Sequence, residues 1–235
     1  TTELAVYGYG TGYEGANTST PSNNVLTFSN EIRVYKSGVF ALPFLASETD
    51  SVVFDINGTE ITQAATTLPL AKVLYIDVSD FEEDVIDIEK DGEIVYSLVT
   101  QDEPRHEPLD IAYINKEGQL STLTFFKEKI DKLEVEGESY ESSFGQPLDG
   151  YHQFKDFNKN GKKSFSVNSG FIDGFNNELF TQLMISESVW SVEDNALKPL
   201  NVISRNLEYK TRQRNRLINY RIDFDYSFNE VNDIW

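Results

Sequence analysis

The stretch from Ile218 to Phe228 limits the fold of this chain more than any other feature, because it alternates strictly between two kinds of side chain. Its even-numbered residues are apolar or aromatic, and its odd-numbered residues are polar or charged. Successive side chains of a strand point to opposite faces. The pattern therefore predicts a long strand with one buried and one exposed face.

A second alternating run, residues 202–209, precedes this strand. The segment between the two runs, residues 210–216, carries Lys210, Arg212, Arg214 and Arg216. Two alternating runs joined by a short polar segment predict a β-hairpin. A hairpin with a basic tip is typical of a platform or an arm and not of a catalytic cleft.

The composition also favours sheet over helix. The chain has 12 Tyr and 16 Phe against one Met, and aromatic residues are enriched in strands. No run of eighteen apolar residues occurs, so no membrane span is predicted. Cysteine is absent, which excludes disulfides and sites built on zinc–thiolate or iron–sulfur bonds.

Acidic residues dominate the charge of the chain, but they are unevenly placed. The formal net charge is −19, which disfavours binding to nucleic acids and to anionic membrane surfaces. Residues 80–103 hold ten acidic residues and one base, whereas residues 198–221 hold seven bases and one acid. Two interpretations stay open: two solvated faces, or a complementary head-to-tail contact between copies of the chain.

Turn signals divide the chain into segments. Residues 1–30 are rich in Gly, Thr, Ser and Asn and predict an extended arm or loop. Residues 31–100 contain about seven short strands, with hairpin signals at Asn57-Gly58 and Asp91-Gly92. This pattern predicts a small β-sandwich of immunoglobulin-like or fibronectin-like type. Residues 101–108 contain two prolines and predict a linker.

Residues 109–235 predict a second unit, a β-barrel-like assembly domain with one helix. Hairpins are expected at 116–118 and at 158–161. The helix is expected over about residues 174–186, because Phe175, Leu179, Phe180, Leu183 and Met184 fall on one face. Asp173 is the expected N-cap residue.

Two short motifs resemble ligand sites but lack the required context. Residues 10–15 match the G-x-G-x-x-G pattern, yet no helix is expected after them to bind a pyrophosphate. Residues 156–161 match the first half of a calcium loop, but Val167 stands where a bidentate Glu is needed. A loop and a hairpin turn are the preferred interpretations, and no cofactor or metal is predicted.

Catalytic groupings are also missing from the sequence. The two histidines, His106 and His152, have no partner at the spacing of a metal site or a catalytic triad. A pair of carboxylates always exists among 39 acidic residues, so such a pair carries little information. The sequence predicts that the protein is not an enzyme.

Several stretches of the chain resemble a known family. They are Leu109–Gly118 followed by Leu123–Lys127, Ser186–Trp190, residues 198–202, Lys210-Thr211, Leu217–Tyr226 and, nearer the start, Tyr7–Gly10 with Glu14-Gly15. They are similar to tail or baseplate structural proteins of bacteriophages that infect Bacteroidetes, mainly over residues 105–235. The resemblance implies a virion component of the tail tip, distal tail or baseplate ring, assembled in the host cytoplasm. It implies no catalytic residues.

The resemblance and the charge pattern together suggest a partner, which is another copy of the chain in a ring beside neighbouring virion proteins. The expected contact joins the basic tip to an acidic surface on a neighbouring copy. The basic residues are Lys210, Arg212, Arg214 and Arg216, and the acidic residues are Asp80, Glu82, Glu83 and Asp84.

Two other functions remain open from the sequence. A receptor- or glycan-binding β-module is one, because Tyr7, Tyr9 and Tyr13 would supply a stacking surface in an exposed loop. A glycoside hydrolase with dispersed carboxylates is the other.

Overall fold

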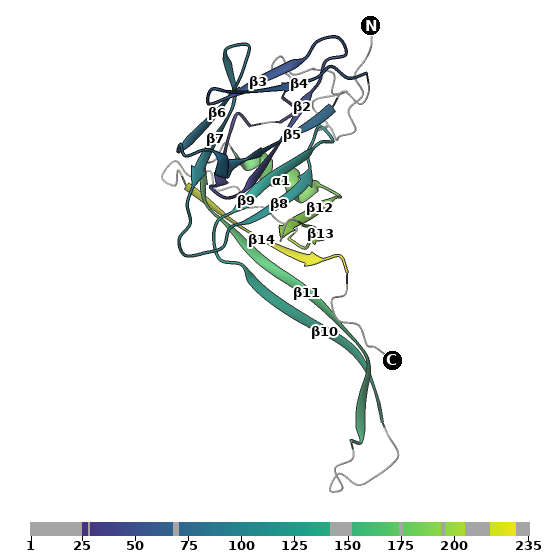
Figure 1. The fold of residues 1–235 in the computed structure, drawn as a ribbon. Helices are drawn as coiled ribbons and strands as arrows, with labels where there is room; N and C mark the ends of the chain where they lie inside the picture. Colours follow the sequence, from purple (N-terminus) through teal and green to yellow (C-terminus); the bar gives the residue numbers. More distant parts are fainter. Residues whose placement is uncertain are drawn as a thin grey trace.

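The computed structural model describes residues 25–27, 29–67, 71–141, 152–173, 176–193, 196–204 and 217–228. This part of the chain forms three sheets, one α-helix and one short 3-10 helix, η1 (Val78–Asp80) (Figure 1). The predicted mainly β fold with one helix is therefore confirmed.

The first sheet contains five strands in the order β1-β7-β6-β3-β4. Only its β1–β7 pair is parallel, and the other pairs are antiparallel. The strands are β1 (Glu31–Tyr35), β3 (Val52–Ile56), β4 (Thr59–Gln63), β6 (Val85–Lys90) and β7 (Glu93–Gln101).

A two-stranded sheet, β2 (Val39–Leu45) with β5 (Ala71–Asp77), packs on the first sheet through aromatic side chains. Phe40 stacks on Tyr96 with ring centroids 5.4 Å apart. Phe44 meets Phe54 edge to face at 5.2 Å. All four rings are buried, so these contacts hold the two sheets together.

The tight turns form where the sequence predicts them. Asn57 and Gly58 connect β3 to β4 with φ values of 46° and 86°, and Asp91 and Gly92 connect β6 to β7 at 55° and 79°. Two consecutive residues with positive φ are typical of the type I′ turn, whose twist matches that of the flanking strands.

Replacing Gly58 by Ala is expected to destabilise the protein by about 1–2 kcal/mol. A Cβ atom at this position would meet nothing within 4 Å, so the cost comes from the positive φ and not from a clash. Urea unfolding of Gly58→Ala beside the exposed-strand control Glu60→Ala measures the effect. Equal stability of the two variants would contradict this explanation.

The second large sheet has seven strands, all antiparallel, in the order β10-β11-β14-β13-β12-β8-β9. Its strands are β8 (Leu109–Ile114), β9 (Leu120–Phe125), β10 (Ile130–Glu141), β11 (Phe154–Asp173), β12 (Val189–Glu193), β13 (Ala196–Val202) and β14 (Leu217–Tyr226). The predicted hairpin at 116–118 connects β8 to β9, with Gly118 at φ 71°.

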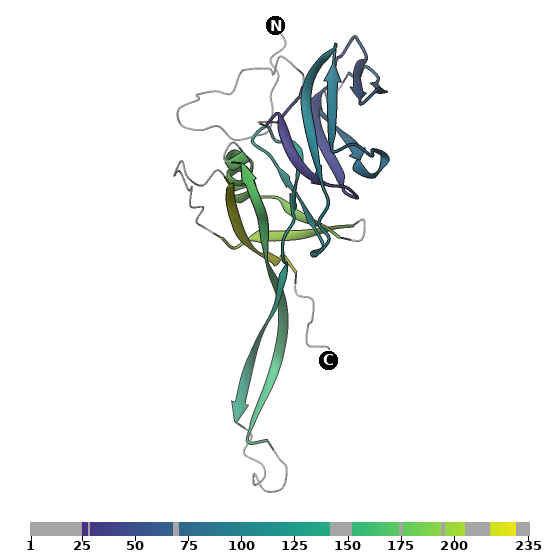
Figure 2. The same ribbon diagram turned by 90° about the vertical axis from the view of Figure 1, so that its left-hand side faces the viewer.

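The predicted barrel is not found, because the edge strands of this sheet do not pair with each other in the described part of the chain. One edge strand, β10, leaves the sheet together with β11 (Figure 2). The other, β9, lies against β2, where the Ala41 N–H donates to Thr122 Oγ1 at 3.3 Å. The two edge strands therefore lie apart, and the sheet stays open.

The closing strand is confirmed as β14, which lies inside the seven-stranded sheet. Tyr220, Ile222, Phe224 and Tyr226 are buried, as the alternation predicts. Phe228 is 42% exposed, since the strand ends at Tyr226. The preceding strand was predicted over residues 202–209. The structure has β13 before this range, ending at Val202, and residues 205–209 lie outside the described part.

The helix α1 (Asn177–Ile185) is also confirmed, but it begins later than predicted. Its N-cap residue is Asn176, so the assignment of this role to Asp173 is wrong; Asp173 ends β11. Phe180 packs against Phe125 at 5.9 Å and Tyr220 at 5.0 Å. The helix thereby covers one face of the seven-stranded sheet.

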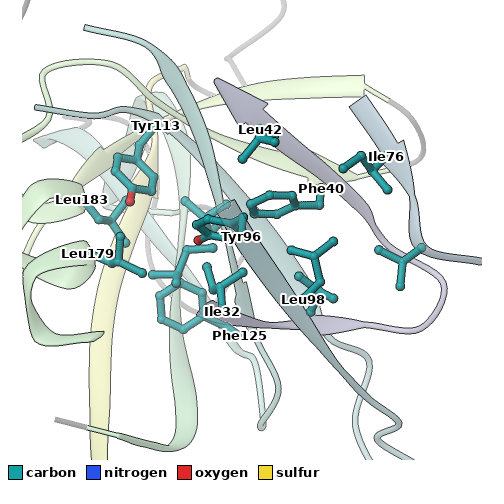
Figure 3. Packing of buried hydrophobic residues seen from close by; sticks show 14 of the residues in the cluster. Ile32, Phe40, Leu42, Ile76, Tyr96, Leu98, Tyr113, Phe125, Leu179 and Leu183 are labelled. Carbon is teal, nitrogen blue, oxygen red and sulfur yellow. The ribbon is translucent and has the colours of Figure 1, made fainter. Parts of the chain in front are cut away.

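The hydrophobic core is continuous between the two predicted units. Ile32, Phe40 and Leu98 belong to the same buried cluster as Phe125 and Leu183 (Figure 3). Within the predicted linker, Glu103 is buried and forms an ion pair with Lys127 at 2.5 Å. These contacts join the sheets on either side of residues 101–108.

Candidate functional site

A two-stranded ribbon projects from the seven-stranded sheet (Figures 1 and 2). It consists of residues 133–141 of β10 and 154–163 of β11. The pairing of β11 with β14 starts at Ser164, so residues 154–163 pair with β10 and with no other described strand. The sheet thus holds the second half of β11, while its first half extends outward with β10.

A β-bulge twists the ribbon halfway along its length. Glu136 pairs with Asn160 and Glu138 with Phe157, which leaves two residues of β11 opposite Gly137. Asn158 in the bulge has φ 51°. A Cβ atom on Gly137 would lie 3.0 Å from the Cγ atom of Lys159, so a residue without a side chain suits this position.

The prediction of a hairpin turn at 158–161 is therefore wrong. These residues lie inside β11, and the chain reverses between Glu141 and Phe154 instead. Asn, Lys and Gly are common in turns, which explains the prediction. Pairing with the glutamate-rich β10 stabilises the extended conformation, and the bulge accommodates Asn158 at its positive φ.

Large apolar side chains are exposed along the ribbon. Leu133 and Val135 are each 55% exposed, and Phe154 is 65% exposed. Tyr140 and Phe157 are also exposed and meet edge to face at 5.6 Å. Exposed apolar side chains on a projecting pair of strands are a candidate interaction surface.

A charged group, here named the root cluster, holds the ribbon to the sheet. Glu193 at the end of β12 accepts hydrogen bonds from Lys129 at 3.0 Å, Lys198 at 2.6 Å and the Tyr226 hydroxyl at 2.9 Å. Lys129 immediately precedes β10 and also lies 4.7 Å from the Phe165 ring centroid. The cluster therefore connects the start of β10 with four other strands of the sheet, β11, β12, β13 and β14.

A second ion pair supports the ribbon from β11. Lys162 forms it with Asp225 of β14. Lys129 additionally lies 3.6 Å from Asp131. The base of each ribbon strand is thus tied to the sheet by a lysine, which fixes the direction in which the ribbon leaves it.

The root cluster strongly perturbs Glu193. Burial by itself would raise the pKa of Glu193, but hydrogen bonds from Lys198, Lys129 and Tyr226 lower it to about 2. Burial, and then the Glu193 carboxylate, raise the pKa of the Tyr226 hydroxyl. Both shifts favour the ionised carboxylate that holds the cluster together.

We expect Glu193→Gln to cost about 1–3 kcal/mol near neutral pH, because charge-assisted hydrogen bonds from two lysines are weakened. The ionised Glu193 stabilises the fold in full above its ordinary pKa of 4.5, and this contribution is lost as the pH falls toward its folded pKa of about 2. The variant should therefore lose less stability than the parent over this range. Urea unfolding at several pH values measures the difference, with exposed Glu187→Gln as the control; parallel pH profiles would contradict the assignment.

A hollow of about 430 Å³ lies where the ribbon meets the sheet. Its lining is mostly polar or charged and comprises Glu134, Glu136, Asn160, Lys162, Ser227 and Phe228. Small-molecule sites are usually enclosed and lined by apolar side chains. The hollow suits a polar contact with another macromolecule better than it suits a small ligand.

The acidic residues of the predicted contact between copies lie next to the five-stranded sheet, between η1 and β6. Asp80 ends η1, and Glu82, Glu83 and Asp84 follow in the segment before β6, all of them exposed. Lys36 lies 3.5 Å from Asp84. The basic half, Lys210, Arg212, Arg214 and Arg216, lies outside the described residues, so the pairing of the two halves stays a prediction.

The remaining sequence motifs are the glycine-rich segment, the tyrosine loop and the calcium-like segment. Residues 10–15 and the tyrosines Tyr7, Tyr9 and Tyr13 lie outside the described residues. The calcium-like segment 156–161 belongs to β11, and no group of three or more metal-ligating side chains occurs among the residues that the structure describes.

The sequence pattern did not reveal the ribbon, although a sign of it was present. Glutamates recur at every second residue from Glu134 to Glu138, and Lys155, Lys159, Lys162 and Lys163 follow later in the chain. Opposite charges on two neighbouring strand-like segments indicate pairing between them. That comparison places the reversal of the chain between the two segments and not at residues 158–161.

No helix in the described parts of the chain is long and apolar enough to cross a membrane. The chain matches no protein-family model, no curated protein and no solved structure.

Proposed function

We propose that this protein is a structural subunit of a bacteriophage tail, in the tail tip, the distal tail or a baseplate ring, and that it works by self-assembly. The observation that carries the proposal is the ribbon, which exposes apolar side chains and has strand edges that no described strand occupies. Surfaces of this kind are normally covered by a partner, because an open strand edge otherwise promotes aggregation.

The sequence supports the viral assignment independently. The resemblance to tail and baseplate proteins lies mainly in residues 105–235, and this range contains the ribbon and the whole seven-stranded sheet. In this proposal the partners are further copies of the chain and neighbouring virion proteins, and the location is the virion.

In this proposal the first part of the chain forms a separate architectural element, a small β-sandwich. Contacts between the two smaller sheets, through Phe40–Tyr96 and Phe44–Phe54, support a small immunoglobulin-like or fibronectin-like sandwich. No catalytic role is part of this proposal.

Native mass spectrometry and negative-stain imaging of the purified chain test the proposal. We expect a closed oligomer with one stoichiometry, whose population rises with protein concentration. A strict monomer at high concentration, or an open-ended aggregate without a defined mass, would contradict assembly into a ring.

A further inference from the structure

The two strands of the ribbon carry opposite charge. Residues 133–141 of β10 contain four glutamates and no basic residue. Residues 154–163 of β11 contain four lysines and one aspartate. The ribbon thus has an acidic strand and a basic strand side by side.

Each of these strands offers one edge that no described strand occupies. β10 is the terminal strand of the seven-stranded sheet, so its outer edge has no partner in the described chain. No described strand pairs with the outer edge of residues 154–163 either, since β14 pairs with β11 only from Ser164 onward. Strand edges that no described strand occupies can accept a further strand from another chain.

We propose that the acidic β10 edge of one copy pairs with the basic β11 edge of the next copy, which joins the ribbons into one continuous antiparallel sheet. The proposal rests on the proposed self-assembly and specifies how the copies meet. Acidic and basic strands then alternate throughout the sheet, and every acidic strand is flanked by a basic strand on each side.

Charge selects this arrangement over a two-fold dimer. A symmetric β10–β10 contact would place Glu134, Glu136 and Glu138 beside the same residues of the partner. A symmetric β11–β11 contact would place lysines beside lysines. Like charges directly opposite each other destabilise strand pairing, whereas opposite charges stabilise it.

The strand directions also agree with a head-to-tail contact. Within one ribbon β10 and β11 are antiparallel. When ribbons stand side by side and point the same way, β10 of one copy is therefore antiparallel to β11 of the next. Each copy uses both of its edges once, so the contact is heterologous and leaves no free edge when it closes into a ring.

Apolar side chains of the ribbon add to the same contact. Leu133 and Val135 share one face of β10, and the contacting rings of Tyr140 and Phe157 share a face as well. Neighbouring strands lie about 4.8 Å apart, so these side chains would reach their counterparts on the adjoining ribbon. Pairing would remove apolar surface from water in addition to satisfying backbone groups.

Two charge-reversed variants test the proposal. Glu136→Lys with Glu138→Lys replaces two of the four acidic charges of residues 133–141 by basic ones, so their net charge rises from −4 to 0. Lys155→Glu with Lys159→Glu lowers the net charge of residues 154–163 from +3 to −1. We expect each variant alone to need a roughly tenfold or higher concentration for half-assembly than the parent chain. An equal mixture is expected to assemble at nearly the parental concentration, because the two variants then alternate around the ring.

The mixture separates contacts between copies from effects within one ribbon, since each variant keeps its own altered hairpin in the mixture. Circular dichroism and thermal unfolding establish that both variants fold. Glu60→Lys with Glu93→Lys, two exposed sites on the first sheet, is the control for net charge and should assemble like the parent.

The outcomes distinguish this inference from the proposed function. Normal assembly of either folded variant alone, or failure of the folded mixture to assemble, would overturn the edge pairing while leaving self-assembly intact. A parent chain that stays monomeric would overturn the proposed function and the edge pairing together.

Discussion

A chain without the outer ribbon is expected to be a folded monomer. Residues 136–160 can be deleted and Val135 joined to Gly161 through Asn-Gly, because these two residues already face each other across the hairpin. Asn-Gly favours the type I′ turn that a two-residue connection needs. Both ribbon strands lose most of their open edges, so self-association should fall below detection by native mass spectrometry.

The deletion spares the contacts that hold the ribbon base. Lys162, which pairs with Asp225, and the root cluster around Glu193 remain in the shortened chain. Tyr140 and Phe157, which are removed, contact each other with their rings. We therefore expect the thermal unfolding temperature of the monomer to change by only a few degrees. A shortened chain that still forms the parental oligomer would contradict the role of the ribbon.

Replacing Phe224 by Ala is expected to cost about 3–5 kcal/mol, because a large aromatic side chain is removed from the centre of the core. Phe224 is fully buried in β14, stacks on Phe165 at 5.5 Å and meets Phe125 edge to face at 6.2 Å. Truncation would leave a cavity beside Phe165 of β11 and Phe125 of β9. Urea unfolding at a concentration where the protein is monomeric measures the loss.

Phe228→Ala is the matched control for this substitution. Phe228 lies four residues further along the same alternation but is 42% exposed, and its described ring contact is with Tyr226 at 5.5 Å. We expect the control to cost less than about 1 kcal/mol. Similar losses for the two variants would show that the even-numbered residues of the closing strand do not form the core.

Local chemistry explains why much of the fold follows from the sequence. The alternation along β14 specifies which residues are buried, since a strand has only two faces. Asn57-Gly58 and Asp91-Gly92 form the predicted turns because their positive φ values are available to these residue types. The apolar face of α1 is likewise encoded locally, at Leu179, Phe180 and Leu183.

The predictions that were wrong concern features that depend on partners distant in the sequence. Residues 158–161 have the composition of a turn, yet pairing with β10 keeps them extended. The closure of a sheet is not encoded in the alternation of any one strand. It depends on what lies at the edges, and in this protein β2 covers β9 while β10 leaves with β11.

The sequence did not predict the candidate site. Its uneven charge leaves two interpretations open, two solvated faces or a contact between copies of the chain, and the residues proposed for that contact lie outside the ribbon. The ribbon was not identified, because its two strands are separated by residues 142–153 and their opposite charges become meaningful only when the strands are compared with each other. The basic segment 210–216 is a separate prediction and would act in addition to the ribbon.

The absence of cysteine from the chain permits a direct test of the contact between ribbons. Single cysteines are placed on β10 at Glu134, Glu136 or Glu138, and in separate molecules on β11 at Lys155 or Asn160. Variants are then mixed in pairs under oxidising conditions. A disulfide needs its two Cβ atoms within about 4.5 Å, so only residues on adjoining strands react.

The mass of the covalent products is measured for each cysteine variant alone and for each mixture of two variants. We predict that at least one β10–β11 mixture forms covalent dimers, whereas neither of its two variants does so alone. Dimers formed by a β10 variant on its own, or no covalent dimer in any mixture of variants that still assemble, would contradict head-to-tail pairing of the ribbons.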